Sequence, residues 1–146
     1  MATSGRPRVF LDANVIYSGI HSSGSPPSRI LALHAIGTIQ AVISKLVVDE
    51  TLRNVRAKAP TALPDLFEWL VNVPPDIVPD PSDEDVSAAL VDINFEDAPV
   101  WAAALASEVD YFVTGDRRFL REARAAQASL TALTPRELID RLERSP

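Results

Sequence analysis

The chain of 146 residues has the length of one domain with a single core, and its hydrophobic (47%) and charged (23%) fractions are those of a globular protein. It has no cysteine and only two histidines, which excludes disulfide scaffolds, iron–sulfur clusters, cysteine nucleophiles and a three-histidine zinc site. A formal net charge of −6 argues against passive coating of nucleic acid, but it leaves room for a local basic patch and for a metal site built from carboxylates.

Apolar runs bounded by turn residues predict strands that alternate with helices. In the first half of the chain, strands are expected at Arg8–Asp12 and Gln40–Ser44, with a loop over Ala13–Gly24 between them. Helices are expected after the capping residues Ser25 and Ser44.

The second half continues the same pattern. Helices are predicted over Leu66–Val71, from Ser82 to about Asp92, from Asp97 onward, over Leu120–Ala126 and over Arg136–Glu143, and strands over Asp76–Val78, Tyr111–Thr114 and, weakly, Ser129–Thr131. The alternation predicts an α/β fold in which helices cover both faces of a parallel sheet, as one domain over residues 1–146. No apolar run approaches the roughly 18 residues of a membrane span, and no apolar segment follows the charges of the first eight residues, so we expect a cytoplasmic protein.

Four carboxylates are expected at one edge of this sheet. Asp12 and Asp116 end the first and fourth strands, Asp97 precedes a helix, and Glu50 lies on the first turns of the helix after the second strand. Ligands of open parallel sheets bind at the carboxyl ends of the strands, near the point where strand order reverses. The four acids are therefore candidates for one site.

Each acid also has an ordinary structural interpretation. Asp12 and Asp116 could close turns, Asp97 could be a simple helix cap, and Glu50 could be a solvated helix residue. As a group they are harder to explain in this way, because two carboxylates about 4 Å apart repel by roughly 4 kcal/mol at an effective dielectric of 20. An all-oxygen set suits Mg²⁺ or Mn²⁺ and disfavours zinc.

The segments around these acids resemble the PIN-domain family. Val9-Phe10-Leu11-Asp12-Ala13-Asn14-Val15 is similar to the family's opening strand, and Asp97–Leu105 with Asp110–Asp116 is similar to its second half. Val47–Leu52 matches the middle helix and Thr134–Leu138 the closing segment, so the resemblance covers nearly the whole chain.

This resemblance implies a three-layer α/β/α sandwich whose five-stranded parallel sheet has the order 3-2-1-4-5. It also implies a divalent-metal-dependent endoribonuclease, with Asp12, Asp97 and Asp116 holding Mg²⁺ or Mn²⁺ and Glu50 completing the catalytic site. Asn14 and Thr114 would orient the carboxylates. Glu96 and Asp49 are alternatives to their neighbours Asp97 and Glu50. Small members similar to virulence-associated-protein-C ribonucleases act as toxins, which implies a toxin–antitoxin system with a cognate antitoxin.

Basic residues close to the acids are candidates for RNA binding. Arg117, Arg121 and Arg124 are spaced to share one helix face, and Arg53 and Arg56 follow Glu50. The alternative is a solvated helix face. Tyr17 could stack on a base, whereas the large core aromatics, His21 and His34 are not expected to act on substrate.

Other functions remain open at this level. A non-catalytic RNA-binding or assembly module could keep the fold, although clustered like charges would then serve no purpose. A phosphatase of the haloacid dehalogenase type would need an Asp where Asn14 stands, and a receiver domain would need a lysine after the fifth strand. We further expect a homodimer, formed through Leu66, Phe67, Trp69 and Leu70.

Overall fold

The computed structural model describes residues 5–144. Residues 1–4 and 145–146, which the predicted domain includes, lie outside this part, as does half of the eight-residue segment for which no targeting signal is expected. Within residues 5–144, no helix combines the length and hydropathy that crossing a membrane requires.

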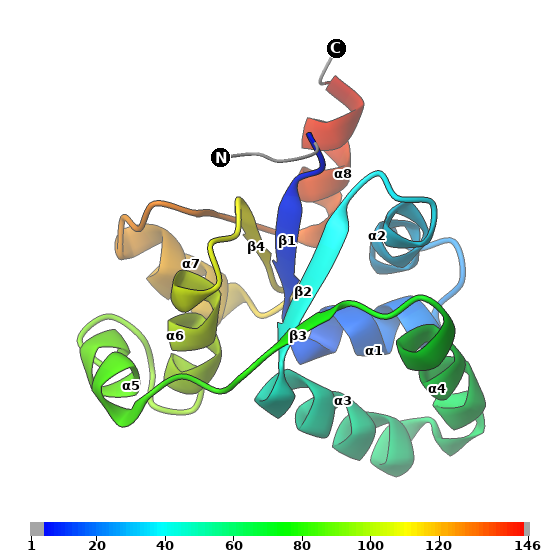
Figure 1. Cartoon of the computed structure of the whole chain (residues 1–146), viewed down its shortest axis with the longest axis horizontal. Coiled ribbons are helices and arrows are strands. Elements are labelled where there is room, and N and C mark those ends of the chain that lie inside the picture. Colours follow the sequence, from blue (N-terminus) through cyan, green and yellow to red (C-terminus); the bar gives the residue numbers. More distant parts are fainter. Residues whose placement is uncertain (1–4, 145–146) are drawn as a thin grey trace.

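Five parallel strands form one sheet in the order β3-β2-β1-β4-β5, which confirms the predicted fold class (Figure 1). The strands are β1 (Arg8–Leu11), β2 (Gln40–Ser44), β3 (Asp76–Val78), β4 (Tyr111–Val113) and β5 (Thr131–Leu133). β1 and β4 are neighbours, with Leu11 opposite Val113. The ends of these two strands, Leu11 and Val113, are 102 positions apart in sequence and therefore meet at one edge only in the folded chain.

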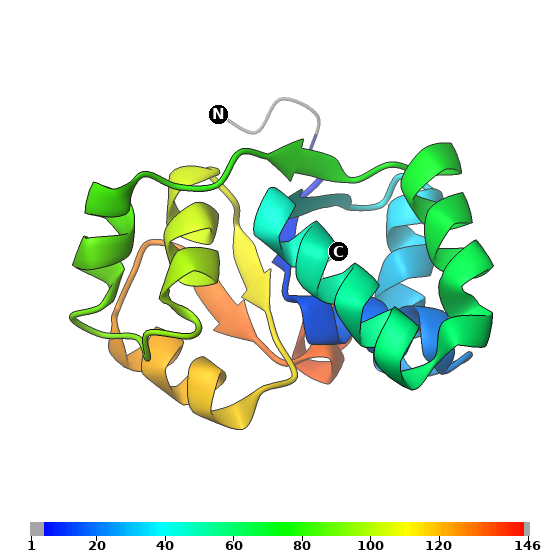
Figure 2. The ribbon, with the colours of Figure 1, turned by 90° about the horizontal axis from the view of Figure 1, so that it is seen from below.

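Helices flank the sheet. They are α1 (Ala13–His21), α2 (Pro26–Ala35), α3 (Lys45–Lys58), α4 (Leu63–Asn72), α5 (Asp83–Ala89), α6 (Ala98–Ala106), α7 (Arg117–Ala125) and α8 (Pro135–Arg144), with a short 3₁₀ turn at Pro60–Ala62. In both views α2, α3 and α4 gather on one side of β1 and β2, while α5, α6 and α7 gather on the other (Figures 1 and 2).

The predicted loop over Ala13–Gly24 is wrong, because most of it forms helix α1. The serine and glycine residues indicated a loop, yet Gly19 lies within the helix, where a Cβ would come within 2.6 Å of Leu31 Cδ1. Glycine is present there because α1 and α2 pack closely together. The side chain of Asp12 caps the helix by accepting a hydrogen bond from the Ala13 N–H.

Several other boundaries differ from the prediction, and α4 begins at Leu63, ahead of the predicted Leu66. α5 ends at Ala89, before the predicted Asp92. α7 begins at Arg117, ahead of Leu120, because the Asp116 side chain caps it. β5 runs from Thr131 to Leu133, two residues later than the predicted segment Ser129–Thr131. The shift places Ala132 and Leu133 in the core, where both are buried.

The core contains the large aromatic residues, as expected. Phe112 contacts Phe10, Trp101 and Phe119, with ring centroids 4.9–6.0 Å apart. His34 is also buried: its Nδ1 accepts a hydrogen bond from the Ala41 N–H, and its Nε2 therefore donates to the carbonyl oxygen of Val73 at 3.0 Å. This is a structural role, in agreement with the sequence analysis.

The apolar surface predicted for a homodimer is wrong in its composition. Leu66 and Trp69 are buried in the core, and Leu70 packs partly against it. Phe67 remains exposed, together with Val71 on the next turn of α4. Phe67 and Val71 are therefore the large apolar residues of α4 that remain exposed for contact with a partner.

Candidate active site

The carboxyl ends of β1 and β4 bring the first two acids to the same edge of the sheet. The Asp12 N–H donates to the Val113 carbonyl oxygen at 3.0 Å, which continues the pairing of the two strands by one residue. Asp116 follows two residues after Thr114. This edge is where strand order reverses, and it is the place predicted for the site.

Asp12 is held by a full set of hydrogen bonds. Its Oδ1 accepts from the Ala13 N–H at 2.8 Å, and its Oδ2 accepts from the Thr114 hydroxyl at 2.8 Å and the Asn14 amide at 3.2 Å. Burial raises the pKa of this carboxyl, these bonds lower it, and the charge of Asp116 raises it again. Asp12 is thus a fixed carboxylate in a setting that disfavours its ionisation.

Asn14, at the start of α1, and Thr114, after β4, connect the ends of β1 and β4. Asn14 Oδ1 accepts from the Gly115 N–H at 2.8 Å, and Thr114 Oγ1 accepts from the Asp116 N–H at 3.1 Å. Thr114 therefore donates to one candidate ligand and positions the backbone of another. These contacts are those expected of residues that orient carboxylates.

Asp116 and Asp97 both precede helices but use their side chains differently. Asp116 Oδ1 accepts from the Phe119 N–H at 3.0 Å and caps α7. Asp97 occupies the capping position of α6, yet its side chain makes no capping hydrogen bond. Its Oδ2 is buried and has no hydrogen-bond partner among residues 5–144. The simple helix-cap interpretation of Asp97 is therefore wrong.

The environment of Asp97 strongly disfavours its charge. Burial raises its pKa to about 6, with further contributions from the charges of Asp12 and Asp116 that Arg118 partly offsets. Glu122 also raises this pKa, and its Oε1 accepts from the Asn94 N–H at 3.0 Å. The sequence does not point to Glu122 as part of the site, because its proximity to Asp97 depends on how α7 packs.

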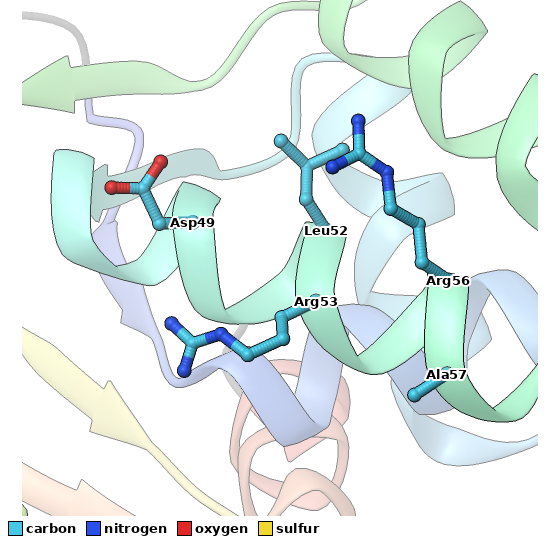
Figure 3. A pocket seen from close by; sticks show the side chains of 5 residues that line it. All are labelled: Asp49, Leu52, Arg53, Arg56 and Ala57. Carbon is cyan, nitrogen blue, oxygen red and sulfur yellow. The ribbon is translucent and has the colours of Figure 1, made fainter.

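Glu50 approaches the same acids from α3. Burial raises its pKa first, followed by the charge of Asp12, while Arg53 lowers it. Its neighbour Asp49 is exposed and lines an open pocket of about 480 Å³ beside α3. Arg53 and Arg56 line the same pocket, and their side chains point away from α3 in different directions (Figure 3). Glu96 is likewise exposed. The structure therefore favours Glu50 and Asp97 over these alternatives.

The donor set fits a hard divalent cation in its chemistry, because it consists of carboxylate oxygens and includes the orphaned Oδ2 of Asp97. As placed, however, no three acidic or histidine side chains among residues 5–144 stand close enough together to hold an ion. Asp12 and Asp116 direct oxygens at backbone N–H groups instead. Metal binding would require the candidate acids to come closer together.

The arginines of α7 separate into different environments. Arg117 and Arg121 are exposed and form no ion pair within the described part of the chain. Arg124 instead donates from Nε to the Ala132 carbonyl oxygen at 3.1 Å and pairs with Glu137 at 2.5 Å. Arg118, which the sequence analysis did not select, lies 3.6 Å from Asp97 Oδ2.

Tyr17, expected in a loop, lies on α1, where its ring stacks on His21 with centroids 5.5 Å apart. Lys58 Nζ lies over the same ring, 5.9 Å from its centroid. The loop position expected for Tyr17 is therefore wrong, and its ring already contacts His21 and Lys58.

Comparison with known proteins identifies relatives of this fold. Residues 8–118 match the family model described as PIN domain. No curated protein matches the sequence. The chain resembles one in the crystal structure of VapBC2 from Rickettsia felis bound to a DNA fragment from their promoter, with 17% identity, a TM-score of 0.66 and coverage of 87% of this chain and 98% of that one. It also resembles PAE2754 from Pyrobaculum aerophilum, with 18% identity, a TM-score of 0.69 and coverage of 99% and 96%.

Proposed function

The chain belongs to the PIN domain family, and from this premise we propose that it is a divalent-metal-dependent endoribonuclease and the toxin of a toxin–antitoxin pair. The observation that carries the proposal is Asp97. A capping position whose carboxylate does not cap, with a buried oxygen that has no partner, is better suited to a ligand than to a structural role.

We assign the metal-holding role to Asp12, Asp97, Asp116 and Glu50. A Mg²⁺ or Mn²⁺ ion held there would supply a Lewis acid for a phosphate oxygen and a water of lowered pKa. Asp12 is kept in one orientation by Thr114 and Asn14, so the position of its carboxylate is set before a ligand arrives. Glu50, whose pKa is raised, is suited to accept a proton from an attacking water.

Arg117, Arg121 and Arg53 are proposed to contact RNA phosphates. Arg117 and Arg121 are exposed on α7 directly after Asp116, and Arg53 lies next to Glu50 on α3. With a net charge of −6, the molecule needs such local positive charge to hold a polyanion. Arg124 is a weaker candidate, because it is engaged at β5.

A toxin role in the cytoplasm, a cognate antitoxin and a homodimer belong to the same proposal. Their support is the family membership and the shared fold with a chain of VapBC2, a protein crystallised on promoter DNA.

The substitution Asp12→Asn tests the nuclease proposal. The amide keeps the shape of the side chain but removes one ligand charge, so Mn²⁺-dependent cleavage of single-stranded RNA should fall by at least about 100-fold. The control is Asp49→Asn, which removes an exposed carboxylate from the same edge region and should leave cleavage unchanged.

Cleavage by the Asp12→Asn variant at the wild-type rate would contradict the assignment of the site. If the wild-type protein binds RNA equally well in Mn²⁺ and in EDTA and never cleaves it, the alternative of a non-catalytic RNA-binding module is correct.

A further inference from the structure

Arg118 is the cation nearest to the unpartnered oxygen of Asp97. Its Nη2 lies 3.6 Å from Asp97 Oδ2 and 3.9 Å from Glu96 Oε1, and its side chain is 46% exposed. Both distances exceed that of a hydrogen bond. Arg118 is therefore held near Asp97 by charge, without a directional contact.

Other arginines in the described chain are bound more tightly. Arg8 Nη1 lies 2.8 Å from Asp76 Oδ2, and Arg124 Nη2 lies 2.5 Å from Glu137 Oε1. Arg124 also donates to a backbone carbonyl oxygen. Arg118 lacks such anchoring although it faces a buried carboxylate oxygen, which leaves it free to move away.

We propose that Arg118 is a built-in counter-cation of Asp97 that competes with a divalent ion for this carboxylate and so sets how readily the site takes up metal. The inference rests on the proposed function in one respect, namely that Asp97 is a metal ligand. It goes beyond it by assigning regulation of the site to a residue of α7.

A guanidinium group stays charged in proteins, so the charge of Arg118 cannot be lost by deprotonation. Only movement of the side chain can take this charge away from Asp97. Arg118 and a divalent ion cannot both lie against Asp97 Oδ2 without repelling each other. Metal uptake must therefore include displacement of Arg118. The half-exposed side chain can move into solvent, and the cost of that movement is low because the side chain forms no hydrogen bond within the described part of the chain.

Manganese titration of Arg118→Ala by calorimetry tests the proposal without relying on nuclease activity. Mn²⁺ should bind roughly tenfold more tightly to this variant than to the wild-type protein, which is the scale expected for groups that act on metal ligands. Arg117→Ala is the matched control, because it removes an equal charge from the same turn of α7 at a residue that forms no ion pair within residues 5–144. Its affinity should stay within about twofold of the wild type, since a solvated charge is screened.

A second measurement in EDTA tests the pairing itself. Arg118→Ala should lower the melting temperature of the wild-type protein but not that of the Asp97→Asn variant, because the contact is already lost there. Arg118→Gln, which keeps more of the side chain, replaces Arg118→Ala if the latter does not fold.

The outcomes separate the two proposals. Equal Mn²⁺ affinities of Arg118→Ala and Arg117→Ala would overturn the inference and leave the nuclease proposal intact. Tighter binding by Arg118→Ala, with no RNA cleavage by the wild-type protein, would support the inference and overturn the nuclease proposal. Absence of Mn²⁺ binding to all variants would overturn both.

Discussion

Thr114 shows how a single side chain organises the candidate site. Its hydroxyl group donates to Asp12 and accepts from the Asp116 N–H, so it connects the ends of β1 and β4. Thr114 is completely buried, and its hydroxyl also accepts from the Asn14 amide at 3.4 Å, so all three of these hydrogen bonds go to residues of the proposed site. Its removal would affect the orientation of two carboxylates at once.

Asp97 should make the stability of the metal-free protein depend on pH. Its pKa is about 6 in the folded protein and near 3.8 as the ordinary value, so the folded state holds the proton more tightly. The stabilisation is complete below about pH 4 and is lost as the pH rises through about 6. Relative to Asp97→Asn, the wild-type protein in EDTA should therefore lose stability between about pH 4 and pH 7.

Urea unfolding at several pH values in this window measures the difference. The Asp97→Asn variant retains Asp12 and Glu50, so the difference between the two proteins reports the Asp97 carboxyl together with its charge coupling to these neighbours. A difference between the two proteins that does not change with pH would contradict the assigned environment of Asp97.

At the scale of elements, β5 is an edge strand that needs protection. Thr131 N–H and the Leu133 carbonyl oxygen bond toward β4, which directs the backbone groups of Ala132 to the open side. Arg124 donates to the Ala132 carbonyl oxygen on that side and is itself fixed by Glu137. The arginine therefore covers part of an edge that could otherwise pair with another chain.

Arg124→Ala should lower the free energy of unfolding by about 1 kcal/mol, the typical contribution of a hydrogen bond, and should increase aggregation on heating. Arg121→Ala, on the same helix but without an ion pair in the described chain, is the control and should change neither. Chemical unfolding and light scattering provide the two measurements. Unchanged stability of Arg124→Ala would mean that the edge contact is not formed in solution.

For the whole molecule, the homodimer stays a prediction that now depends on a smaller surface. Phe67 and Val71 are 43% and 75% exposed and lie one turn apart on α4. Burying such apolar side chains against a second copy is the common route to a two-fold dimer. We expect a dimer in sedimentation experiments at tens of micromolar and a shift toward monomer in Val71→Asp. Monomer alone for the wild-type protein would contradict the prediction.

Local patterns in the sequence were sufficient to predict the α/β fold class and to single out the four acids as candidates for one site. Strands such as Arg8–Leu11 are short apolar runs, and Ser25, Ser44 and Ser82 cap the helices that follow them. These signals depend on residues within a few positions of one another. Because parallel strands end at a common edge, the positions of Asp12 and Asp116 followed from them.

Tertiary structure alone decided what the individual side chains contact. From the sequence alone, Gly19 indicates a loop and Trp69 a surface for a partner. In the fold, Gly19 packs against α2 and Trp69 is buried in the core. Likewise, Asp97 has a partnerless oxygen and Arg118 faces it only because α6 and α7 meet at this edge. Periodicity and capping determine helices and strands through residues that are near one another in sequence. These contacts instead join residues at least 12 positions apart, such as Gly19 and Leu31, whose proximity is set by how the helices pack on the sheet.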